Sequence, residues 1–264
     1  MISFCGIGQH GQLGNQMFQF AATVGVARKV DTTPAFPVEN IRSNGHKRFR
    51  VPDCFELDRN FLKPRTEIRP DTVFKERQFH FNPQVFEVGD NTDLVGFYQS
   101  EKYFSAAEPE IRKNLVFKLA IVERAQMHLR GVSGTKVAVH VRRGDYVNNP
   151  AHGDLIGSNY YPTAMSSFDG MDCIFVVVSD DIAWCRRNFK HRQCMFLESG
   201  SDFVDLCLMS LCEHNIIANS TFSWWGAWLN QNPGKQVTAP KNWFGEKLRQ
   251  HDHKDIYCDH WMQI

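Results

Sequence analysis

Two adjacent arginines in residues 140–146 (HVRRGDY) are the strongest candidates for chemistry, because they directly follow a β-rich run. A guanidinium is always charged and needs oxygen partners, so an anion such as phosphate must compensate the pair at the end of a buried strand. Strand alternation places His140 and Arg142 on one face and Arg143 on the other. We therefore expect Arg142 to bind the ligand and Arg143 to brace the loop through Asp145. An internal Arg–Asp salt bridge that closes a turn is the alternative.

A second candidate is the Ser179-Asp180-Asp181 segment, which follows another apolar run. Ser179 is expected to cap the next helix, whose positive end the two aspartates favour. A carboxylate of Asp180 or Asp181 is equally suited to accept the ring N–H and the exocyclic amino group of a guanine. Both interpretations stay open on these residues alone.

A third candidate is residues 219–226 (NSTFSWWG), which lie between an apolar strand and a predicted helix. Hydroxyl and backbone N–H groups at a helix N-terminus form an anion site. Ser220, Thr221 and Ser223 are therefore predicted to hold a diphosphate from the side opposite Arg142. The alternative is a capping segment followed by two core tryptophans.

The amino-terminal glycine loop supports a different function. Gly6, Gly8 and Gly11 satisfy the G-x-G-x-x-G pattern between a strand and a helix, and Asp31 follows at the spacing of a ribose-binding carboxylate. This pattern predicts a dinucleotide-binding oxidoreductase. However, the apolar spacing predicts a helix that starts near residues 14–16, too late for Gly11 to lie in its first turn. This function also leaves the arginine pair unexplained.

These candidates depend on elements that alternate along the chain. Strands are predicted at residues 2–7, 94–98, 136–141, 173–178 and 215–218, and helices at 15–30, 105–130, 181–189 and 202–211. Ser105 is the expected N-cap of the helix at 105–130. Prolines punctuate residues 31–93, so short elements and long loops are expected there. Continuous apolar strands alternating with helices indicate an α/β fold with parallel sheets covered on both faces, in which ligands bind beyond the carboxyl ends of the strands.

Composition narrows the function classes further. The 264 residues carry 30 basic and 29 acidic side chains, a net charge of +1, so no overall field attracts nucleic acid or an anionic membrane. No apolar run approaches the roughly 20 residues of a membrane span, and no secretion signal precedes the first strand, so a cytoplasmic protein is predicted. The eight cysteines lack a C-x-x-C pair and are expected to be reduced. The His251-Asp252-His253 cluster is interpreted as a surface segment, not a metal site.

Six motifs resemble, in the same order, those of the bacterial-type α-1,2-fucosyltransferases of glycosyltransferase family 11. They are residues 11–22 (GQLGNQMFQFAA), 96–104 (GFYQSEKYF), 139–146 (VHVRRGDY), 177–181 (VVSDD), 219–229 (NSTFSWWGAWL) and 239–244 (APKNWF). Departures are Gln12 in place of a glycine, Ala218 in place of a serine, and a shorter middle region.

The resemblance implies two facing Rossmann-like domains of the GT-B type, each with a parallel sheet. Residues 1–131 would form the acceptor-side domain and residues 132–264 the donor-binding domain, with the tail packing back on the first. The implied reaction moves L-fucose from GDP-L-fucose, with inversion, to the 2-hydroxyl of a terminal β-galactoside on an oligosaccharide or glycolipid. No metal or other cofactor is implied, and no nucleic-acid partner. Peripheral membrane association is compatible with this substrate.

The resemblance also assigns roles to residues. Arg142 matches the essential arginine at the β-phosphate, and Asp145 beside it is the candidate catalytic carboxylate, with the identity of any base left open. The other donor-binding positions that it implies are His140, Arg143, Ser179, Asp180 and Asp181, then Asn219, Ser220, Thr221, Phe222 and Ser223, and the loop residues Gly14, Asn15 and Gln16. A non-catalytic module that binds a GDP-sugar is the remaining alternative.

Overall fold

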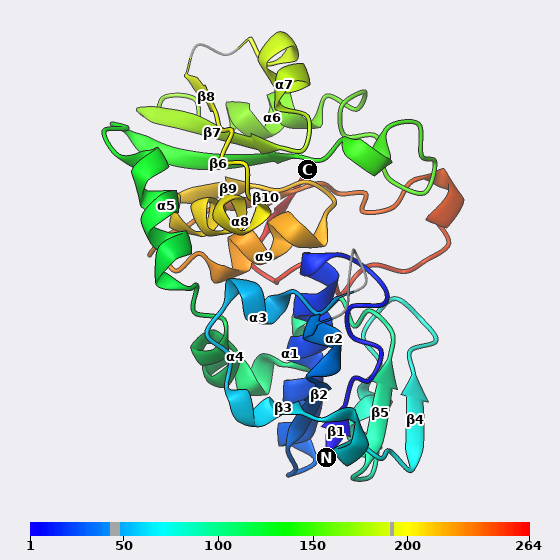
Figure 1. Ribbon diagram of the computed structural model, residues 1–264. Coiled ribbons are helices and arrows are strands. Elements are labelled where there is room, and N and C mark those ends of the chain that lie inside the picture. The colour runs from blue at the N-terminus through cyan, green and yellow to red at the C-terminus, as the bar shows by residue number, and fades with distance from the viewer. Residues whose placement is uncertain (43–47, 191–192) are drawn as a thin grey trace. The chain divides into compact units, whose positions relative to one another are not determined.

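The computed structural model describes residues 1–42, 48–190 and 193–264 (Figure 1). The chain forms two compact units. Unit 1 comprises Met1–Lys118 and His251–Cys258, and unit 2 comprises Leu119–Gln250 and Asp259–Ile264. Compactness thus divides the chain before residue 119, whereas the sequence predicted a boundary after residue 131. The assignment of acceptor and donor binding to separate domains stays a prediction.

Unit 1 is built on a five-stranded parallel sheet in the order β3-β2-β1-β5-β4. Its strands are β1 Ile2–Ser3, β2 Pro34–Pro37, β3 Leu62–Lys63, β4 Thr72–Lys75 and β5 Thr92–Val95. Helix α1, Leu13–Lys29, packs on β1 and β2, and the rings of Phe20 and Phe36 stack with their centroids 5.1 Å apart. Gly25 permits the close approach of the segment after β5, because a Cβ there would lie 2.2 Å from the Tyr103 carbonyl oxygen.

The middle region consists of short elements, as the prolines predicted. Besides strands β2, β3 and β4, they are α2 Glu39–Arg42, α3 Val51–Cys54, and the 3-10 turns η1 Arg59–Phe61, η2 Arg65–Glu67 and η3 Pro83–Glu87. Two further 3-10 turns, η4 Glu101–Tyr103 and η5 Ser105–Ala107, follow β5. The strand predicted at residues 94–98 ends at Val95, and Tyr98 adopts a left-handed φ of 54°. The chain therefore turns away from the sheet directly after β5.

The single helix predicted at residues 105–130 is wrong. Two helices are present, α4 Glu108–Asn114 and α5 Leu119–Leu129, and the residue before α4 is Ala107, not the expected cap Ser105. Between them Phe117 forms an antiparallel bridge with Phe55, and the Lys118 N–H donates to the Cys54 carbonyl at 3.0 Å. This long-range pairing occupies backbone groups that a continuous helix would need.

Unit 2 contains a six-stranded parallel sheet in the order β11-β10-β9-β6-β7-β8. Its strands are β6 Thr135–Val141, β7 Cys173–Ser179, β8 Cys194–Phe196, β9 His214–Ile216, β10 Val237–Ala239 and β11 Met262–Gln263. Its helices are α5, α6 Tyr160–Ser166, α7 Ile182–Asn188, α8 Asp202–Leu211 and α9 Thr221–Leu229, with the 3-10 turns η6 Gly144–Tyr146 and η7 Glu246–Leu248. The parallel sheet and its alternating helices confirm the predicted α/β class.

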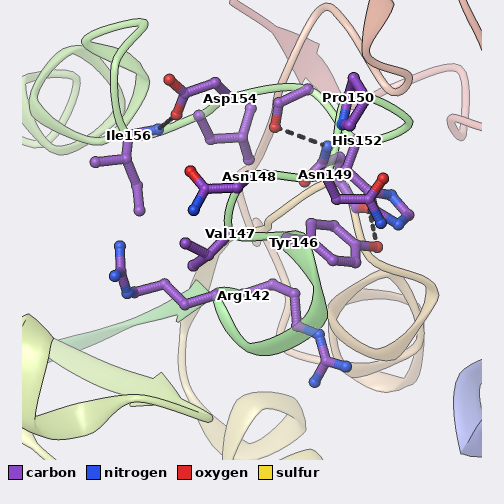
Figure 2. A pocket seen from close by; sticks show the side chains of 13 residues that line it. Arg142, Tyr146, Val147, Asn148, Asn149, Pro150, His152, Asp154 and Ile156 are labelled. Atoms are coloured by element: carbon purple, nitrogen blue, oxygen red, sulfur yellow. Dashed lines mark hydrogen bonds between the residues drawn. The ribbon is translucent and has the colours of Figure 1, made fainter. Parts of the chain in front are cut away.

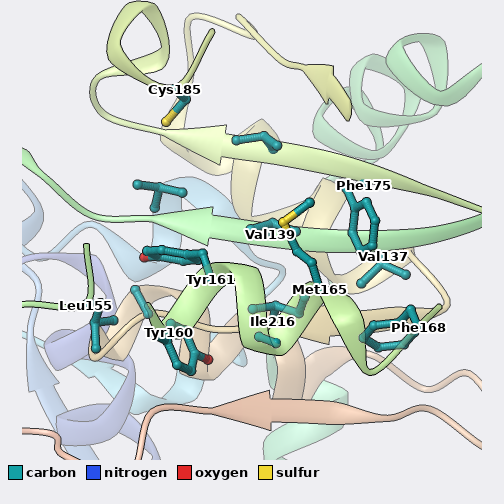
Figure 3. Close-up of a cluster of buried hydrophobic side chains, with 14 of the residues drawn as sticks. Val137, Val139, Leu155, Tyr160, Tyr161, Met165, Phe168, Phe175, Cys185 and Ile216 are labelled. Carbon is teal, nitrogen blue, oxygen red and sulfur yellow. The ribbon is translucent and has the colours of Figure 1, made fainter. Parts of the chain in front are cut away.

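A hydrophobic cluster packs helix α6 against the central strands of the sheet, including β6 and β9 (Figure 3). Val137 and Val139 of β6 pack with Tyr161 and Met165 of α6, while α8 packs against both α5 and α9. The Tyr161 hydroxyl donates to the His140 carbonyl at 3.1 Å. The Tyr160 hydroxyl donates to the Ile217 carbonyl at 2.7 Å. Helix α6 therefore ties together the carboxyl ends of the two strands.

All eight cysteines are free thiols. In the three described stretches, we find no helix with the length and apolar character needed to cross a membrane.

Candidate active site

The polar segments of unit 2 meet at the point where the strand order reverses. From β6 the chain proceeds through β7 to β8 on one side, and then returns to place β9 on the other side of β6. In open parallel sheets ligands bind at such a switch point, beyond the carboxyl ends of the strands. The two loops are joined there, since the Tyr146 hydroxyl after β6 donates to the Asn219 carbonyl after β9 at 3.0 Å.

Arg142 lies at this edge between two carboxylates. Its guanidinium bonds Asp145 at 2.6 Å and Asp180 at 2.9 Å. Asp180 also accepts the Arg143 backbone N–H at 2.8 Å. The expectation that Asp145 would brace Arg143 is therefore wrong, because the i,i+3 geometry of the turn brings Asp145 to Arg142 instead. Two carboxylates orient the arginine that the sequence predicted to bind the ligand.

Gly144 makes this arrangement compatible with the turn. A Cβ at this position would lie 2.5 Å from Asp180 Oδ2, the oxygen that pairs with Arg142. Any larger residue here would force that carboxylate to shift away from its position beside Arg142.

Arg143 braces the neighbouring loop, as expected, but with different partners. Its guanidinium bonds Asp181 at 3.0 Å and lies 4.1 Å from the centroid of the Trp184 ring. The N-cap of α7 is Asp181, which accepts the Trp184 backbone N–H, and not Ser179 as predicted. The Ser179 hydroxyl instead accepts the Asp181 N–H at 3.0 Å. The hydrogen bond from the Trp184 backbone N–H, followed by that from Arg143, holds the pKa of the Asp181 carboxyl below its usual range.

His140 is buried beside the arginine, with its ring centroid 5.5 Å from that of Phe222 at the start of α9. Burial, reinforced by the positive charge of Arg142, lowers the pKa of His140 to about 3, so the imidazole is neutral. Its buried Nδ1 has no hydrogen-bond partner among the described residues. A neutral imidazole at this edge can give or take a hydrogen bond without adding charge.

At the start of α9, not every hydroxyl that the sequence predicted to hold a diphosphate is available to a ligand. Ser220 is the extended N-cap residue of α9, and Thr221 and Phe222, in its first turn, are partly buried. Ser223 is fully buried, and its hydroxyl accepts the Ala218 N–H at 3.1 Å. Ser223 therefore supports the loop from inside, instead of facing a phosphate as the sequence suggested.

The Asn219 side chain is also used inside the protein. Its amide donates to the Trp243 carbonyl at 3.1 Å and to the Gly153 carbonyl at 3.3 Å. Asn219 thus joins the β9 loop to two other loops.

A pocket of about 570 Å³ opens beside Arg142 (Figure 2). Its wall consists largely of Tyr146 and of residues within the segment 147–156, for which the sequence predicted no role. The rings of Tyr146 and His152 stack there, parallel within 2° and 3.6 Å apart. Burial raises the pKa of Tyr146 to about 12, so its hydroxyl keeps the proton that it donates to Asn219. The Asn148-Asn149-Pro150 sequence signals a turn after the arginines, but not what that turn would line.

The unit 1 candidates lie in the first turn of α1, not in a loop. Gln16 is fully buried, and its side chain donates to the Arg48 carbonyl at 3.1 Å and accepts the Arg50 N–H at 2.8 Å. Gly14 is also buried. The Asn15 side chain is partly exposed, and its Oδ1 accepts a hydrogen bond from Gln99 at 2.8 Å. Of the three, Asn15 is the one with a side chain available to a ligand.

The glycine loop is explained by packing. Gly8, with φ of 87°, lies against the chain at Arg48, where a Cβ would be 2.6 Å from the carbonyl carbon. Helix α1 begins at Leu13, so Gly11 precedes it, as the sequence indicated. The dinucleotide fingerprint needs its third glycine for close helix–strand packing, and Gly11 contacts Asn15 instead.

No group of three or more metal-ligating side chains occurs in the stretches 1–42, 48–190 and 193–264. A family model described as glycosyl transferase family 11 matches residues 3–264. The chain belongs to glycosyltransferase family 11.

Relatives of this family 11 protein include two whose names state a reaction. An alpha-1,2-colitosyltransferase of Escherichia coli is 31% identical, with 89% of this chain and 90% of the relative covered. Galactoside 2-alpha-L-fucosyltransferase SEC1 of Bos taurus is 31% identical over 84% of this chain and 63% of the relative. Among solved structures, the Bradyrhizobium fucosyltransferase NodZ has a TM-score of 0.58 and 12% identity, covering 86% of this chain and 93% of NodZ. The structural match shows the fold alone.

Proposed function

We propose that this family 11 protein transfers L-fucose from GDP-L-fucose to the 2-hydroxyl of a terminal β-galactoside, with inversion and without a metal ion. The observation that carries the proposal is the position of Arg142, held by Asp145 and Asp180 at the switch point of unit 2. The names of the relatives support the reaction and the galactoside acceptor.

The chemistry follows from charge. The bond between the sugar C1 and the β-phosphate oxygen breaks, so negative charge builds on the departing GDP. Arg142 and the backbone N–H groups at the start of α9 are proposed to stabilise that charge, which lowers the barrier because they are fixed before the reaction. The acceptor oxygen bonds C1 from the opposite face. Asp145 is proposed to orient Arg142, and His140, Asp180 and Asp181 to read the guanosine.

A second donor is favoured by one observation, the similarity to a colitosyltransferase that covers nearly the whole of both chains. Colitose is L-fucose without its 3-hydroxyl. The protein would then use GDP-colitose with the same arginine and the same acceptor hydroxyl. A cytoplasmic location and a glycolipid acceptor also remain proposals.

The test is a donor panel with a β-galactoside acceptor. The purified protein is incubated with GDP-fucose, GDP-colitose, GDP-mannose or NADH. Binding is measured as the shift in Tm, and transfer is measured as released GDP and glycosylated product. We expect product from GDP-fucose, with linkage to the 2-hydroxyl. Product from GDP-colitose alone would establish the second donor. Donor binding without transfer to any acceptor would indicate a non-catalytic module, and binding of NADH alone would indicate an oxidoreductase.

A further inference from the structure

The segment after β5, residues 96–100, is held by hydrogen bonds to side chains after β4 and in α1, and its residues 98–100 are buried. The carboxylate of Glu76, which directly follows β4, accepts two successive backbone N–H groups, from Phe97 at 2.7 Å and from Tyr98 at 3.0 Å. Gly96 lets the carboxylate approach, because a Cβ there would lie 2.7 Å from Glu76 Oε2. Glu76 therefore fixes the backbone at the point where the chain leaves β5.

The same segment is tied to helix α1 from the other side. The Gln19 amide donates to the Gly96 carbonyl at 3.1 Å. The buried Gln99 then donates to Asn15 Oδ1 at 2.8 Å. A hydrogen bond to Oδ1 fixes the side-chain amide of Asn15, whose Nδ2 donor group then lies on the side of Gly11. An uninterrupted chain of contacts runs from Glu76 to Asn15.

This chain of contacts lies at the switch point of unit 1. The strand order β3-β2-β1-β5-β4 places β1 and β5 side by side, with later strands on opposite sides of β1. Asn15 follows β1 and Gln99 follows β5, so the two side chains meet beyond the carboxyl ends of the two strands. This is the position where open parallel sheets bind their ligands.

We propose that Glu76 is a positioning residue for glycosyl transfer. It holds residues 96–99 so that Gln99 presents the Asn15 amide to the substrate. This inference rests on the proposed function, and it takes Asn15, a donor-binding position that the family resemblance implies, as the group that contacts substrate. Misplacing a substrate-contacting group by about 1 Å can lower the rate by about 100-fold.

A double-mutant cycle tests the proposal with GDP-fucose and a β-galactoside. Glu76→Gln leaves one acceptor oxygen for two N–H groups, so we expect kcat/KM to fall by about tenfold to about 100-fold. In the Asn15→Ala background the same substitution should change kcat/KM less than about twofold, because its effect passes through Asn15. Gln99→Leu, which breaks only the last link, should behave as Glu76→Gln does and covers the case in which that variant folds poorly.

Thr23→Val is the matched control. The buried Thr23 hydroxyl donates to the Gln19 carbonyl at 2.7 Å within α1, so its loss lowers stability without touching residues 96–100. We expect this variant to lower the Tm and to leave kcat/KM near the wild-type value. If the effects of Glu76→Gln and Gln99→Leu on kcat/KM were fully additive with that of Asn15→Ala, the positioning role of Glu76 would be wrong, whereas the proposed function would stand. Normal activity of Asn15→Ala would remove Asn15 from the proposed donor site, and the positioning role with it.

Discussion

Arg142 and Arg143 have the same charge and neighbouring positions but different surroundings. Arg142 faces the pocket between an exposed carboxylate, Asp145, and a more buried one, Asp180. An exposed ion pair is worth little in free energy, so an incoming diphosphate can displace Asp145 at low cost. Arg143 is instead sandwiched by Asp181 and Trp184. Both arginines line the pocket, and their different surroundings support the proposal that Arg142 binds the ligand while Arg143 braces the loop.

This difference predicts unequal effects of the same substitution. Arg142→Lys keeps the charge but loses the planar fork, so kcat/KM with GDP-fucose should fall by about 100-fold to 1,000-fold, as for the loss of an oxyanion donor. Arg143→Lys should cost less than about tenfold, because it weakens a stacked ion pair away from the phosphate. Steady-state kinetics of the two variants measure this. Near-normal turnover of Arg142→Lys would contradict the proposed role.

Glu76 predicts a pH dependence of stability. Burial raises its pKa from 4.5 to about 7, although the Phe97 and Tyr98 N–H groups act in the opposite direction. Since the folded-state pKa lies above that of the unfolded chain, its contribution is fully present below about pH 4.5 and is lost as pH rises to about 7. The free energy of unfolding of wild type, relative to Glu76→Gln, should fall across this window. Urea unfolding at several pH values measures the difference, and parallel curves would refute the shifted pKa.

At the scale of elements, the conformation of the loop after β6 depends on Gly144, which follows the two arginines. Gly144→Ala would push its Cβ to 2.5 Å from the Asp180 oxygen that orients Arg142. We expect kcat/KM to fall by about tenfold to about 100-fold with the fold retained, because the arginine is displaced. Activity and circular dichroism of the variant are the measurements.

Gly6→Ala is the matched substitution in the glycine loop, where an added Cβ meets nothing within 4 Å. It should leave activity unchanged. An equal loss of activity in both variants would show that the loss in Gly144→Ala does not arise from displacement of Asp180.

At the scale of the whole molecule, the proposed compensation of the diphosphate charge without a divalent ion has a direct consequence. GDP at about 100 times its Kd should stabilise the folded protein by about 2.7 kcal/mol, with and without EDTA. The Tm and the turnover rate measured with excess EDTA should equal the values measured without EDTA, both in metal-free and in metal-supplemented samples. Loss of activity in EDTA that Mg²⁺ or Mn²⁺ restores would show that a metal takes part.

The sequence by itself determined the parts of this protein whose information is local. The buried strands β6 and β7, the helix α8 and the polar residues at the strand ends are visible as short apolar runs and helical spacing, and they led to the parallel sheet and to Arg142. The start of α1 after the glycine loop was read from the same kind of local pattern.

Tertiary structure alone decided which groups meet. The break between α4 and α5 exists because residues 117 and 118 pair with residues 54 and 55, far away along the chain. Asp180 orients Arg142, and Glu76 fixes the loop that reaches Asn15, through contacts between separate strand ends. Periodicity encodes which face of an element is buried, whereas the partner of a polar side chain depends on strand order, and strand order is settled by packing of the whole sheet.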